Sequence, residues 1–587
     1  MNWSKIGFLA LAWLYAGTLM AQVVPGSVDI VDTPKWKQIK YDRDSVGELS
    51  WRPDHNSGDS CMVVTTFVQP DFIHNLSVRI PLKKGRIKAA NAIALLSFEA
   101  KTVKASLETG EARCLWILNR SEDPKDKLFH TVSLGAEWKT YYIPLELGPE
   151  ADPQKLMLTL QFGFPPQEFW LKNIHLHLYP PGTEISSLPR TRVTYPGMEP
   201  DAPWRKLAAE RIEQHRKGNF QVRFMHKGQP LSSAKVQIEL RRHHFGWGAA
   251  INSKDMLENG AHFDHFSRLF NLAVFENDLK IKPWTKADRH KEVIDCIKLL
   301  RDNKIDVKGH VLIWPGFKYL PESFSKNQNN PKKIEQLQQQ HLKSILSATK
   351  GLISHWDVVN EAYTNTDLQR ITGSEAILYR GFFGLKKSDS TALRYVNEYG
   401  IISKGGLDKK KQQWYYDFVQ RIDKNTGGLV DGIGMQSHIG TDLTPPEKVY
   451  EILEFYAPLQ KQLAISEFTM DIDDPQVREQ YTRDFITVAF SHPAVHEFLF
   501  WGYQSDKSDI YTEKWEYGAM GRAFFDLVHR QWITKEQLTT DASGQARFRG
   551  FYATYKYTVV LGQEVVEGTF DAFPGSTNQV IEITVEK

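Results

Sequence analysis

Apolar and polar residues alternate along the first third of the chain. In residues 156–162 every second position is Leu or Phe, and in residues 174–178 Ile and Leu alternate with histidines. A period of two gives a strand one apolar face that can be buried. Clusters of turn-forming residues, such as 121–124, separate these runs. Residues 25–180 are therefore predicted to form a β-sandwich, with a jelly roll as the expected arrangement.

From Phe245 onward, short apolar runs alternate with stretches of helical periodicity, as where Val293, Ile297 and Leu300 share one face. The apolar runs predict eight strands, near 246–251, 270–275, 306–313, 353–360, 394–397, 430–436, 462–467 and 496–502. Eight strand-helix units over residues 245–530 match the usual size of a (β/α)₈ TIM barrel, about 250 residues. The predicted class is therefore α/β.

Two further β segments flank this region. Residues 181–218 contain a linker rich in Pro and Gly and then a helix, after which residues 219–241 alternate as two strands of a predicted hairpin. Residues 536–587 contain additional alternating runs. An isolated hairpin is at best marginally stable in water. Because the ends of a domain often lie close together, both segments are predicted to form one small accessory β-sandwich with a structural role.

The charge balance excludes some partners. The 587 residues include 73 basic and 70 acidic side chains, for a net charge of +3. Because no run of Lys or Arg stands out, neither nucleic acid nor a membrane surface is an expected partner. Lys5 followed by an apolar run from Ile6 to Ala21 predicts a secretory signal peptide over residues 1–21. The protein is thus expected to be secreted or periplasmic, with no membrane insertion after cleavage.

Three cysteines are too few for a disulfide framework. Cys61 and Cys114 share the first domain, and pairing or buried free thiols are both open. Cys296 lies on an apolar helical face, which favours a place in the core. Neither a metal-ligand spacing nor a nucleophile elbow stands out, so no metal and no organic cofactor is expected.

Two of the predicted strands deliver a glutamate at their ends. The run 355–360 is followed by Glu361, and the run 463–466 by Glu467. One such residue would ordinarily be a solvated carboxylate, but a pair is what glycoside hydrolysis requires. One group protonates the leaving oxygen and the other meets the anomeric carbon. The strand between them, 432–438, ends in amide and imidazole groups, which bind sugar hydroxyls or orient a carboxylate.

Six short motifs follow one another at predicted strand ends: 275–280 (Phe-Glu-Asn-Asp-Leu-Lys), 309–314 (Gly-His-Val-Leu-Ile-Trp), 356–361 (Trp-Asp-Val-Val-Asn-Glu), 435–438 (Met-Gln-Ser-His), 465–467 (Ile-Ser-Glu) and 501–502 (Trp-Gly). In this order they resemble glycoside hydrolase family 10, the family of retaining endo-β-1,4-xylanases. The resemblance implies that Glu361 is the general acid/base and Glu467 the nucleophile. It also implies a polysaccharide substrate, contacted by Glu276, Asn277, Lys280, His310, Asn360, Gln436, His438 and Trp501.

The histidine at the end of the sixth motif has an expected partner. His438 should hydrogen-bond Glu467 and keep it ionised. Members of the family usually carry an aspartate, which supports this histidine, where this chain has Thr469. The second ring nitrogen must therefore find another acceptor, and Asp471 would serve if the chain bulges.

Two other departures concern substrate recognition. Residues 315–317 are Pro-Gly-Phe where most family members carry His-Ser-Gln, and Asp509 stands where the family has a second tryptophan. β-1,4-Xylan is the expected substrate, and a decorated or differently linked β-glycan is its rival. A non-catalytic glycan-binding protein on the same scaffold is the alternative of another class, and the presence of both glutamates favours the enzyme.

The N-terminal β region carries a looser resemblance. Residues 138–145 and 170–176 are similar to the closing strands of carbohydrate-binding modules appended to polysaccharidases. Sugar binding and a sandwich without a ligand both remain open for this domain.

Overall fold

The computed structural model describes residues 27–586, apart from short gaps at 40, 44, 54–59, 85–89, 106–111, 124, 135–137, 153, 192, 441–442, 471 and 473. The predicted signal peptide, residues 1–21, lies outside the described residues. The chain divides into two units, with the boundary between Arg192 and Val193. Among the described helices none has the length and apolar character needed to span a membrane.

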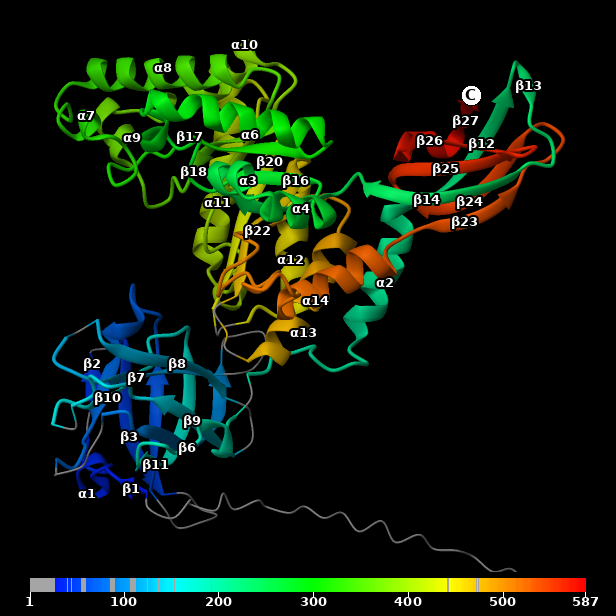
Figure 1. The fold of residues 1–587 in the computed structure, drawn as a ribbon. Coiled ribbons are helices and arrows are strands. Elements are labelled where there is room, and N and C mark those ends of the chain that lie inside the picture. Colours follow the sequence, from blue (N-terminus) through cyan, green and yellow to red (C-terminus); the bar gives the residue numbers. More distant parts are fainter. Residues whose placement is uncertain are drawn as a thin grey trace, which may run out of the picture. The chain divides into compact units, whose positions relative to one another are not determined.

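The first unit is a sandwich of two sheets (Figure 1). The larger sheet contains β1 (Val28–Asp29), β2 (Tyr41–Arg43), β3 (Gly47–Pro53), β4 (Ser60–Thr66), β6 (Ile93–Ala105), β9 (Lys139–Glu146) and β11 (Gln167–Tyr179). The smaller sheet contains β5 (Ser77–Ile80), β7 (Ala112–Asn119), β8 (Lys127–Leu134) and β10 (Met157–Gln161). Short helices α1 (Thr33–Trp36) and η1 (Ile73–Asn75) lie between strands, and η2 (Ile185–Ser187) follows β11. The predicted sandwich is confirmed.

The alternation in the sequence accounts for the core of this unit. Leu158 and Leu160 of β10 face inward with Leu176 and Leu178 of β11. No disulfide joins the cysteines of β4 and β7, and both thiols are buried. Burial raises the pKa of the Cys114 thiol. Of the two alternatives left open by the sequence, the structure therefore has buried thiols.

The second unit contains a closed barrel of eight parallel strands, which confirms the predicted barrel. Its strands are β15 (Gly246–Ile251), β16 (Leu272–Phe275), β17 (Asp306–Ile313), β18 (His355–Asn360), β19 (Leu393–Glu398), β20 (Gly432–Ile439), β21 (Gln462–Met470) and β22 (Val495–Phe500). Every residue of β18 is buried, as expected of parallel strands covered on both faces. β21 extends to Met470 instead of ending at Glu467, so this glutamate lies inside a strand.

Helices connect successive barrel strands. They are α3 (Ser253–Glu258), α4 (Gly260–Leu269), α5 (Ile281–Trp284), η3 (Ala287–Arg289), α6 (His290–Asp302), α7 (Glu322–Ser325), α8 (Pro331–Ala348), α9 (Asp367–Thr372), α10 (Ala376–Ser388), η4 (Lys404–Gly406), α11 (Lys409–Thr426), α12 (Pro446–Tyr456), η5 (Ala457–Leu459) and α13 (Pro475–Ser491), with α14 (Ala519–Asp526) and η6 (Leu527–Gln531) after the last strand. In α11 the Asp408 side chain caps the first turn, and Gly427 ends the helix in a left-handed conformation. The predicted apolar face of α6 is buried in the barrel core.

The accessory sandwich combines segments from both sides of the barrel, as predicted. One sheet contains β12 (Lys217–His226), β13 (Gln229–Pro230), β24 (Gln545–Phe551) and β27 (Val580–Thr584), and the other contains β14 (Lys235–His243), β23 (Lys535–Thr539), β25 (Ala553–Leu561) and β26 (Glu564–Ala572), with the helix η7 (Pro574–Asn578) before β27. The two sheets share one apolar core.

The predicted hairpin of residues 219–241 is wrong in its pairing. β12 pairs with β13, β24 and β27, whereas β14 pairs with β23 and β25 in the other sheet. The apolar face of each strand explains the difference. Val222 of β12 and Ile238 of β14 are fully buried in the same core, so the strands oppose each other across the sandwich instead of along one sheet.

The helix α2 (Pro203–Arg216) joins the accessory sandwich to the barrel. Its buried residues, which pack into the barrel core, are Trp204, Ala208 and Ile212. Arg205 forms an ion pair of 2.6 Å with the fully buried side chain of Asp484 on α13. The buried carboxylate thus has a charged partner, which such a group requires.

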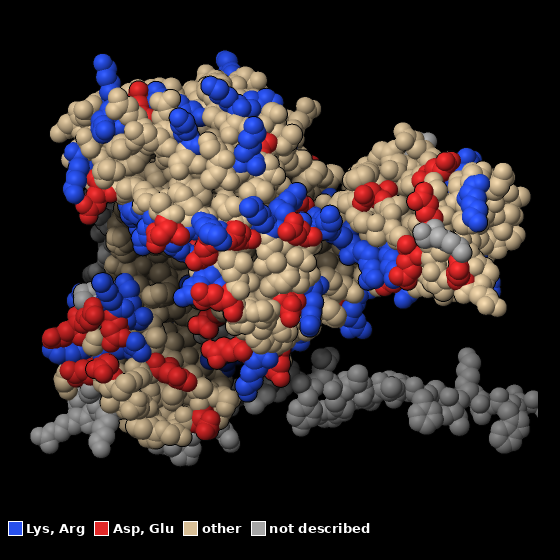
Figure 2. All heavy atoms as spheres, turned by 45° about the horizontal axis from the view of Figure 1, so that its top comes forward, with Lys and Arg blue, Asp and Glu red and all other residues tan. Residues whose placement is uncertain are grey.

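Charges of both signs are mixed on one face of the protein. Figure 2 shows Lys and Arg side chains interspersed with Asp and Glu over the face that it draws. This distribution agrees with the near balance of 73 basic and 70 acidic residues.

Candidate active site

Both glutamates have a left-handed backbone conformation. Glu361 directly follows β18 with φ of 52°, and Glu467 lies in β21 with φ of 57°. The pairing of β20 with β21 shifts register between Gln436 and His438. Glu467 and Phe468 stand opposite Ser437 alone, so Glu467 lies in a bulge. Such conformations are uncommon for residues other than glycine and cluster at functional sites. A bulge redirects the side chain that it carries.

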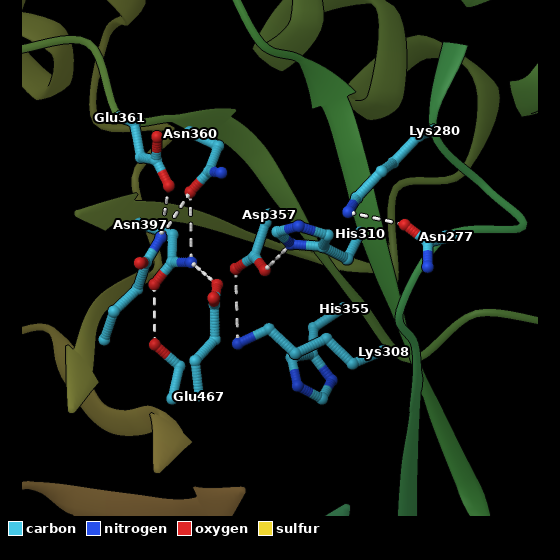
Figure 3. Close-up of polar contacts among 12 residues, drawn as sticks. Asn277, Lys280, Lys308, His310, His355, Asp357, Asn360, Glu361, Asn397 and Glu467 are labelled. Atoms are coloured by element: carbon cyan, nitrogen blue, oxygen red, sulfur yellow. Dashed lines mark hydrogen bonds and ion pairs between the residues drawn. The ribbon is translucent and has the colours of Figure 1, made fainter. Parts of the chain in front are cut away.

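Amide side chains connect the two carboxylates. Nδ2 of Asn397 donates to Oε1 of Glu467 at 2.8 Å and to Oδ1 of Asn360 at 3.1 Å. Nε2 of Gln436 donates to the same oxygen of Asn360 at 3.2 Å and to Oε1 of Glu361 at 3.1 Å. Figure 3 shows Asn360 and Asn397 between the two glutamates. The positions of the carboxylates are therefore fixed relative to each other.

Asn397 is a site residue that the sequence analysis missed. It is buried at 2% exposure, and the Ser466 hydroxyl donates to its Oδ1 at 2.6 Å. This bond identifies the carbonyl end of the amide and directs the NH₂ group at the carboxylate. Asn397 is the last residue of its predicted strand, as Asn360 is of its own. This position at a strand end is the sequence feature that could have identified it as a site residue.

Glu361 has the electrostatics of a proton donor. Burial raises the pKa of its carboxyl group, and the negative charge of Glu467 raises it further. The hydrogen bond from Gln436 acts in the opposite direction. A raised pKa keeps a carboxylic acid protonated closer to neutral pH, as general acid catalysis requires.

His438 contacts Glu467, as predicted. Its Nε2 lies 3.2 Å from Oε2 of Glu467, and its Nδ1 lies 3.0 Å from the hydroxyl of Thr469. Thr469 is thus the second partner, while Asp471 lies outside the described residues. A hydroxyl group can donate, unlike a carboxylate. Thr469 can therefore donate to Nδ1 of a neutral ring whose Nε2–H donates to Glu467.

Asp357 orients the ring of His310. No role was predicted for Asp357 from the sequence. Nδ1 of His310 lies 2.9 Å from Oδ2 of Asp357, and both side chains are buried. Within the described part of the chain, Nε2 of His310 and Nδ2 of Asn360 have no hydrogen-bond partner. Buried polar atoms without partners are rare in proteins, and these two are available to sugar hydroxyls.

A buried network inside the barrel supports Asp357. Nζ of Lys308 lies 3.2 Å from Oδ1 of Asp357 and 2.6 Å from Oε1 of Glu497. His355 lies 2.6 Å from the other oxygen of Glu497. Burial acts to raise the pKa of Glu497, but His355 and Lys308 hold it below its usual range. The chain of charges fixes Asp357, and through it the ring of His310 (Figure 3).

The second strand contributes a charged group to the same site. Nζ of Lys280 donates to Oδ1 of Asn277 at 2.9 Å. Burial lowers the pKa of Lys280, whereas the charges of Glu467, Glu276 and Glu361 favour its protonated form. Nζ of Lys280 also lies 5.2 Å from the centre of the Trp314 ring, which places this charge beside the end of β17.

A hollow lies beside the nucleophile position. It has a volume of about 700 Å³ and is lined by residues that include Glu276, His438, Thr469 and Trp501. Trp501 also makes an edge-on contact with His310, with ring centroids 5.2 Å apart. Of the residues predicted to contact substrate, Glu276, His438 and Trp501 line this hollow. Gln436 and His438 bond the two glutamates directly, and His310 contacts Trp501.

The departures from the family pattern have structural roles here. A Cβ atom at Gly316 would lie 2.3 Å from Oδ1 of Asn365, and Asn365 donates to the backbone oxygen of Glu361 at 3.0 Å. Glycine at this position therefore makes room for a residue that holds the chain after β18. Asp509 accepts hydrogen bonds from the backbone of Ala519 at 2.9 Å and Met520 at 3.3 Å, at the start of α14.

Comparison with known proteins gives consistent matches. Residues 238–525 match the model of Glycosyl hydrolase family 10. Anti-sigma-I factor RsgI6 of Acetivibrio thermocellus is 29% identical over 376 residues, which cover 61% of this chain and 47% of that protein. Endo-1,4-beta-xylanase 1 of Arabidopsis thaliana is 27% identical over 367 residues, covering 61% of this chain and 38% of that protein. This chain thus spans less than half the length of either relative.

One solved structure among the matches is that of xylanase 10B from Thermotoga petrophila RKU-1 in complex with xylobiose. It is 22% identical, with a TM-score of 0.44, and the match covers 49% of this chain and 95% of that one. Endo-1,4-beta-xylanase B of Thermotoga neapolitana is 25% identical over 291 residues, covering 46% of this chain and 80% of that protein.

Proposed function

Since the barrel domain of this chain belongs to glycosyl hydrolase family 10, we propose that the protein is a secreted retaining endo-glycosidase that hydrolyses a β-linked polysaccharide, with β-1,4-xylan as its substrate. The observation that carries the proposal is the amide bridge between Glu361 and Glu467 through Gln436, Asn360 and Asn397. It holds one carboxyl group with a raised pKa beside a second one, as double displacement requires.

In the first step, a carboxylate oxygen of Glu467 attacks the anomeric carbon. The bond from that carbon to the leaving sugar's oxygen breaks, and Glu361 gives its proton to that oxygen. The products are a glycosyl ester on Glu467 and the released sugar chain. Asn397 and His438, both within hydrogen-bond distance of Glu467, keep the attacking carboxylate oriented.

In the second step, Glu361 acts as a base because the first step left it ionised. It removes a proton from a water molecule, whose oxygen attacks the anomeric carbon and displaces Glu467. Two inversions at one carbon give overall retention of the β configuration. His310 and Asn360, with their open polar atoms, hold hydroxyl groups of the sugar at the reacting position.

The choice of xylan rests on relatives. Proteins of Arabidopsis thaliana and Thermotoga neapolitana that match this chain are named endo-1,4-beta-xylanases. The altered residues 315–317 and Asp509 support the rival, a decorated or differently linked β-glycan, because they lie in segments that recognise sugars in the family. A measurement over several polymers separates the two.

Release of reducing ends should be measured over a panel of xylans, mixed-linkage glucans and algal glycans. The proposal predicts hydrolysis of unsubstituted xylan by the wild type and none by Glu361→Gln or Glu467→Gln. Glu567→Gln is a matched control, because that side chain is 51% exposed on the accessory sandwich. Activity confined to another glycan would replace xylan, and equal activity in all variants would overturn the roles of both glutamates.

Azide separates the two roles. In Glu361→Ala no general base is present, and a small anion can attack the glycosyl ester on Glu467 without one. Azide should therefore restore turnover of an activated aryl glycoside and give the β-glycosyl azide. If azide instead restored the activity of Glu467→Ala and gave this β product, while Glu361→Ala stayed inactive, the roles of acid/base and nucleophile would have to be exchanged.

Secretion rests on the apolar segment of residues 6–21. Expression in the source cells followed by mass spectrometry of the purified protein should find an N-terminus close after Ala21. Recovery of the intact N-terminus from the cytoplasm would contradict export.

A further inference from the structure

Two histidines and an aspartate meet on the N-terminal sandwich. His175 and His177 lie on β11, and Asp29 lies on β1, which pairs with β11 in antiparallel fashion. Asp29 stands directly opposite His177 in that pairing. The labels of β1 and β11 lie together at one edge of this unit in Figure 1. These residues take no part in the proposed hydrolysis.

A bulge in β11 determines where the histidines point. The register of β11 against β6 shifts between Lys172 and His175, and Asn173 has φ of 52°. Because side chains alternate along a strand, one extra residue reverses which positions face inward. After the bulge, Ile174 and Leu176 are buried, so both histidines lie on the outer face of the sheet.

The three side chains are already close together. Nδ1 of His175 lies 2.9 Å from Oδ2 of Asp29. One ligand atom from each of Asp29, His175 and His177 lies within 4.8 Å of the others. The His175 side chain is 42% exposed and that of Asp29 24%, so an ion could enter from solvent.

The carboxylate is oriented by the backbone around it. Oδ1 of Asp29 accepts hydrogen bonds from the backbone of Val31 at 3.1 Å and Leu176 at 3.2 Å, which leaves Oδ2 directed at His175. Nζ of Lys83 donates to the backbone oxygen of Asp29, at 3.4 Å, and not to its carboxylate. Such contacts behind the ligands are typical of metal sites.

We propose that Asp29, His175 and His177 bind a divalent transition metal ion of the zinc type in the N-terminal sandwich. Two imidazoles and a carboxylate are the ligands that zinc prefers over calcium or magnesium. Zinc–nitrogen bonds of about 2.0–2.1 Å require the three atoms to close slightly, which rotation of half-exposed rings permits. The ion replaces the proton between His175 and Asp29, and solvent completes its coordination.

The bound ion would stabilise the attachment of β1 to β11. β1 pairs with β11 through two residues, so few backbone hydrogen bonds join these two strands directly. An ion that joins Asp29 to both histidines links the two strands, and binding to the folded state alone stabilises it. The role of the site is therefore structural. It joins Asp29 to His175, which are 146 residues apart in the sequence.

Zinc binding should be measured by calorimetry on the full chain without a histidine tag. The wild type is expected to bind one zinc ion at this site. Asp29→Asn keeps the acceptor for the two backbone amides but removes the charge, and His177→Gln removes one ligand. Loss of a residue that only supports a metal ligand weakens metal binding by roughly 10- to 100-fold. Each of these two variants should weaken zinc binding by more than that.

His74→Gln is the matched control, because His74 is an exposed histidine of the same unit that lies outside the cluster. The affinity of this variant for zinc should equal that of the wild type. Cobalt(II) gives a second readout that does not depend on the variants' stability. With the wild type it should give the visible absorption of an ion of low coordination number with nitrogen ligands. Absence of a saturable site, a spectrum of fully hydrated cobalt, or an affinity for zinc equal to that of the wild type in both ligand variants would overturn the proposal.

Discussion

The side-chain amide of Asn397 donates a hydrogen bond of 2.8 Å to Oε1 of Glu467. The second hydrogen of the same NH₂ group is directed to Asn360, the residue before Glu361, at 3.1 Å. One buried amide thus orients the nucleophile and is tied to the strand that carries the acid. This makes Asn397 a positioning residue for both carboxylates.

Replacement of Asn397 by Ala should lower kcat for xylan with little change in the fold. A hydrogen bond to a charged group contributes about 1.5–3 kcal/mol, which corresponds to roughly a 10- to 150-fold loss in rate. Steady-state kinetics with a melting curve measure both effects. Asn303→Ala is the control, since that side chain is exposed at the end of α6. A variant with unchanged kcat would show that the amide bridge does not orient Glu467.

Gln436→Leu should move the alkaline limb of the pH profile upward. The hydrogen bond from Gln436 lowers the pKa of Glu361, so its removal raises that pKa. Glu361 donates a proton in the first step and is active only while protonated. The rate therefore persists to higher pH in the variant than in the wild type. The profile of kcat/KM for the free enzyme reports this.

The control for this experiment is Gln413→Leu, an exposed residue of α11 that bonds Asp417 at 2.9 Å. Its alkaline limb should coincide with that of the wild type. A limb that moves to lower pH in Gln436→Leu would contradict the assigned direction.

Thr469→Val should reduce kcat/KM, whereas Thr469→Ser should not. The valine lacks the hydroxyl that lies 3.0 Å from Nδ1 of His438, so the ring loses the hydrogen bond on the side away from Glu467. A neutral hydrogen bond contributes about 0.5–1.5 kcal/mol, or roughly 2- to 12-fold in kcat/KM. Equal kinetics for the two variants would mean that His438 is oriented by other contacts.

Val222→Ala should destabilise the second unit through the accessory core. Val222 is fully buried there, and loss of two methyl groups with the cavity that they leave costs about 2 kcal/mol. Val565→Ala is the matched control, because Val565 is 62% exposed and such changes stay within about 0.5 kcal/mol. Denaturant unfolding of both variants measures the difference. Equal stability of the two variants would show that burial of Val222 in the accessory core does not stabilise the second unit.

The sequence was sufficient to predict those elements whose apolar pattern fits only one kind of secondary structure. The eight barrel strands are runs buried on both faces, and the glutamates follow them closely enough in sequence to be found. The contact of His438 with Glu467 was also predictable, because neighbouring parallel strands bring their carboxyl ends together. The raised pKa of Glu361 follows from burial and from a second carboxylate nearby.

Other features depend on contacts that no local pattern encodes. The strands β12 and β14 have apolar faces that fit either one sheet or two, and the residues after the barrel decide between them. The bulge at Glu467 appears only in the register of β21 against β20. The cluster of Asp29 with His175 and His177 joins residues 146 positions apart, so their spacing in the sequence gave no metal-binding signal.

The central claim is that Glu361 and Glu467 act as acid/base and nucleophile in a double displacement. The most direct test is proton NMR of the anomeric signals during the first minutes of xylan hydrolysis, before mutarotation mixes them. The account predicts that the newly formed reducing ends appear first as the β anomer and convert slowly to the equilibrium mixture. Initial formation of the α anomer would mean a single displacement by water and would contradict the assigned mechanism.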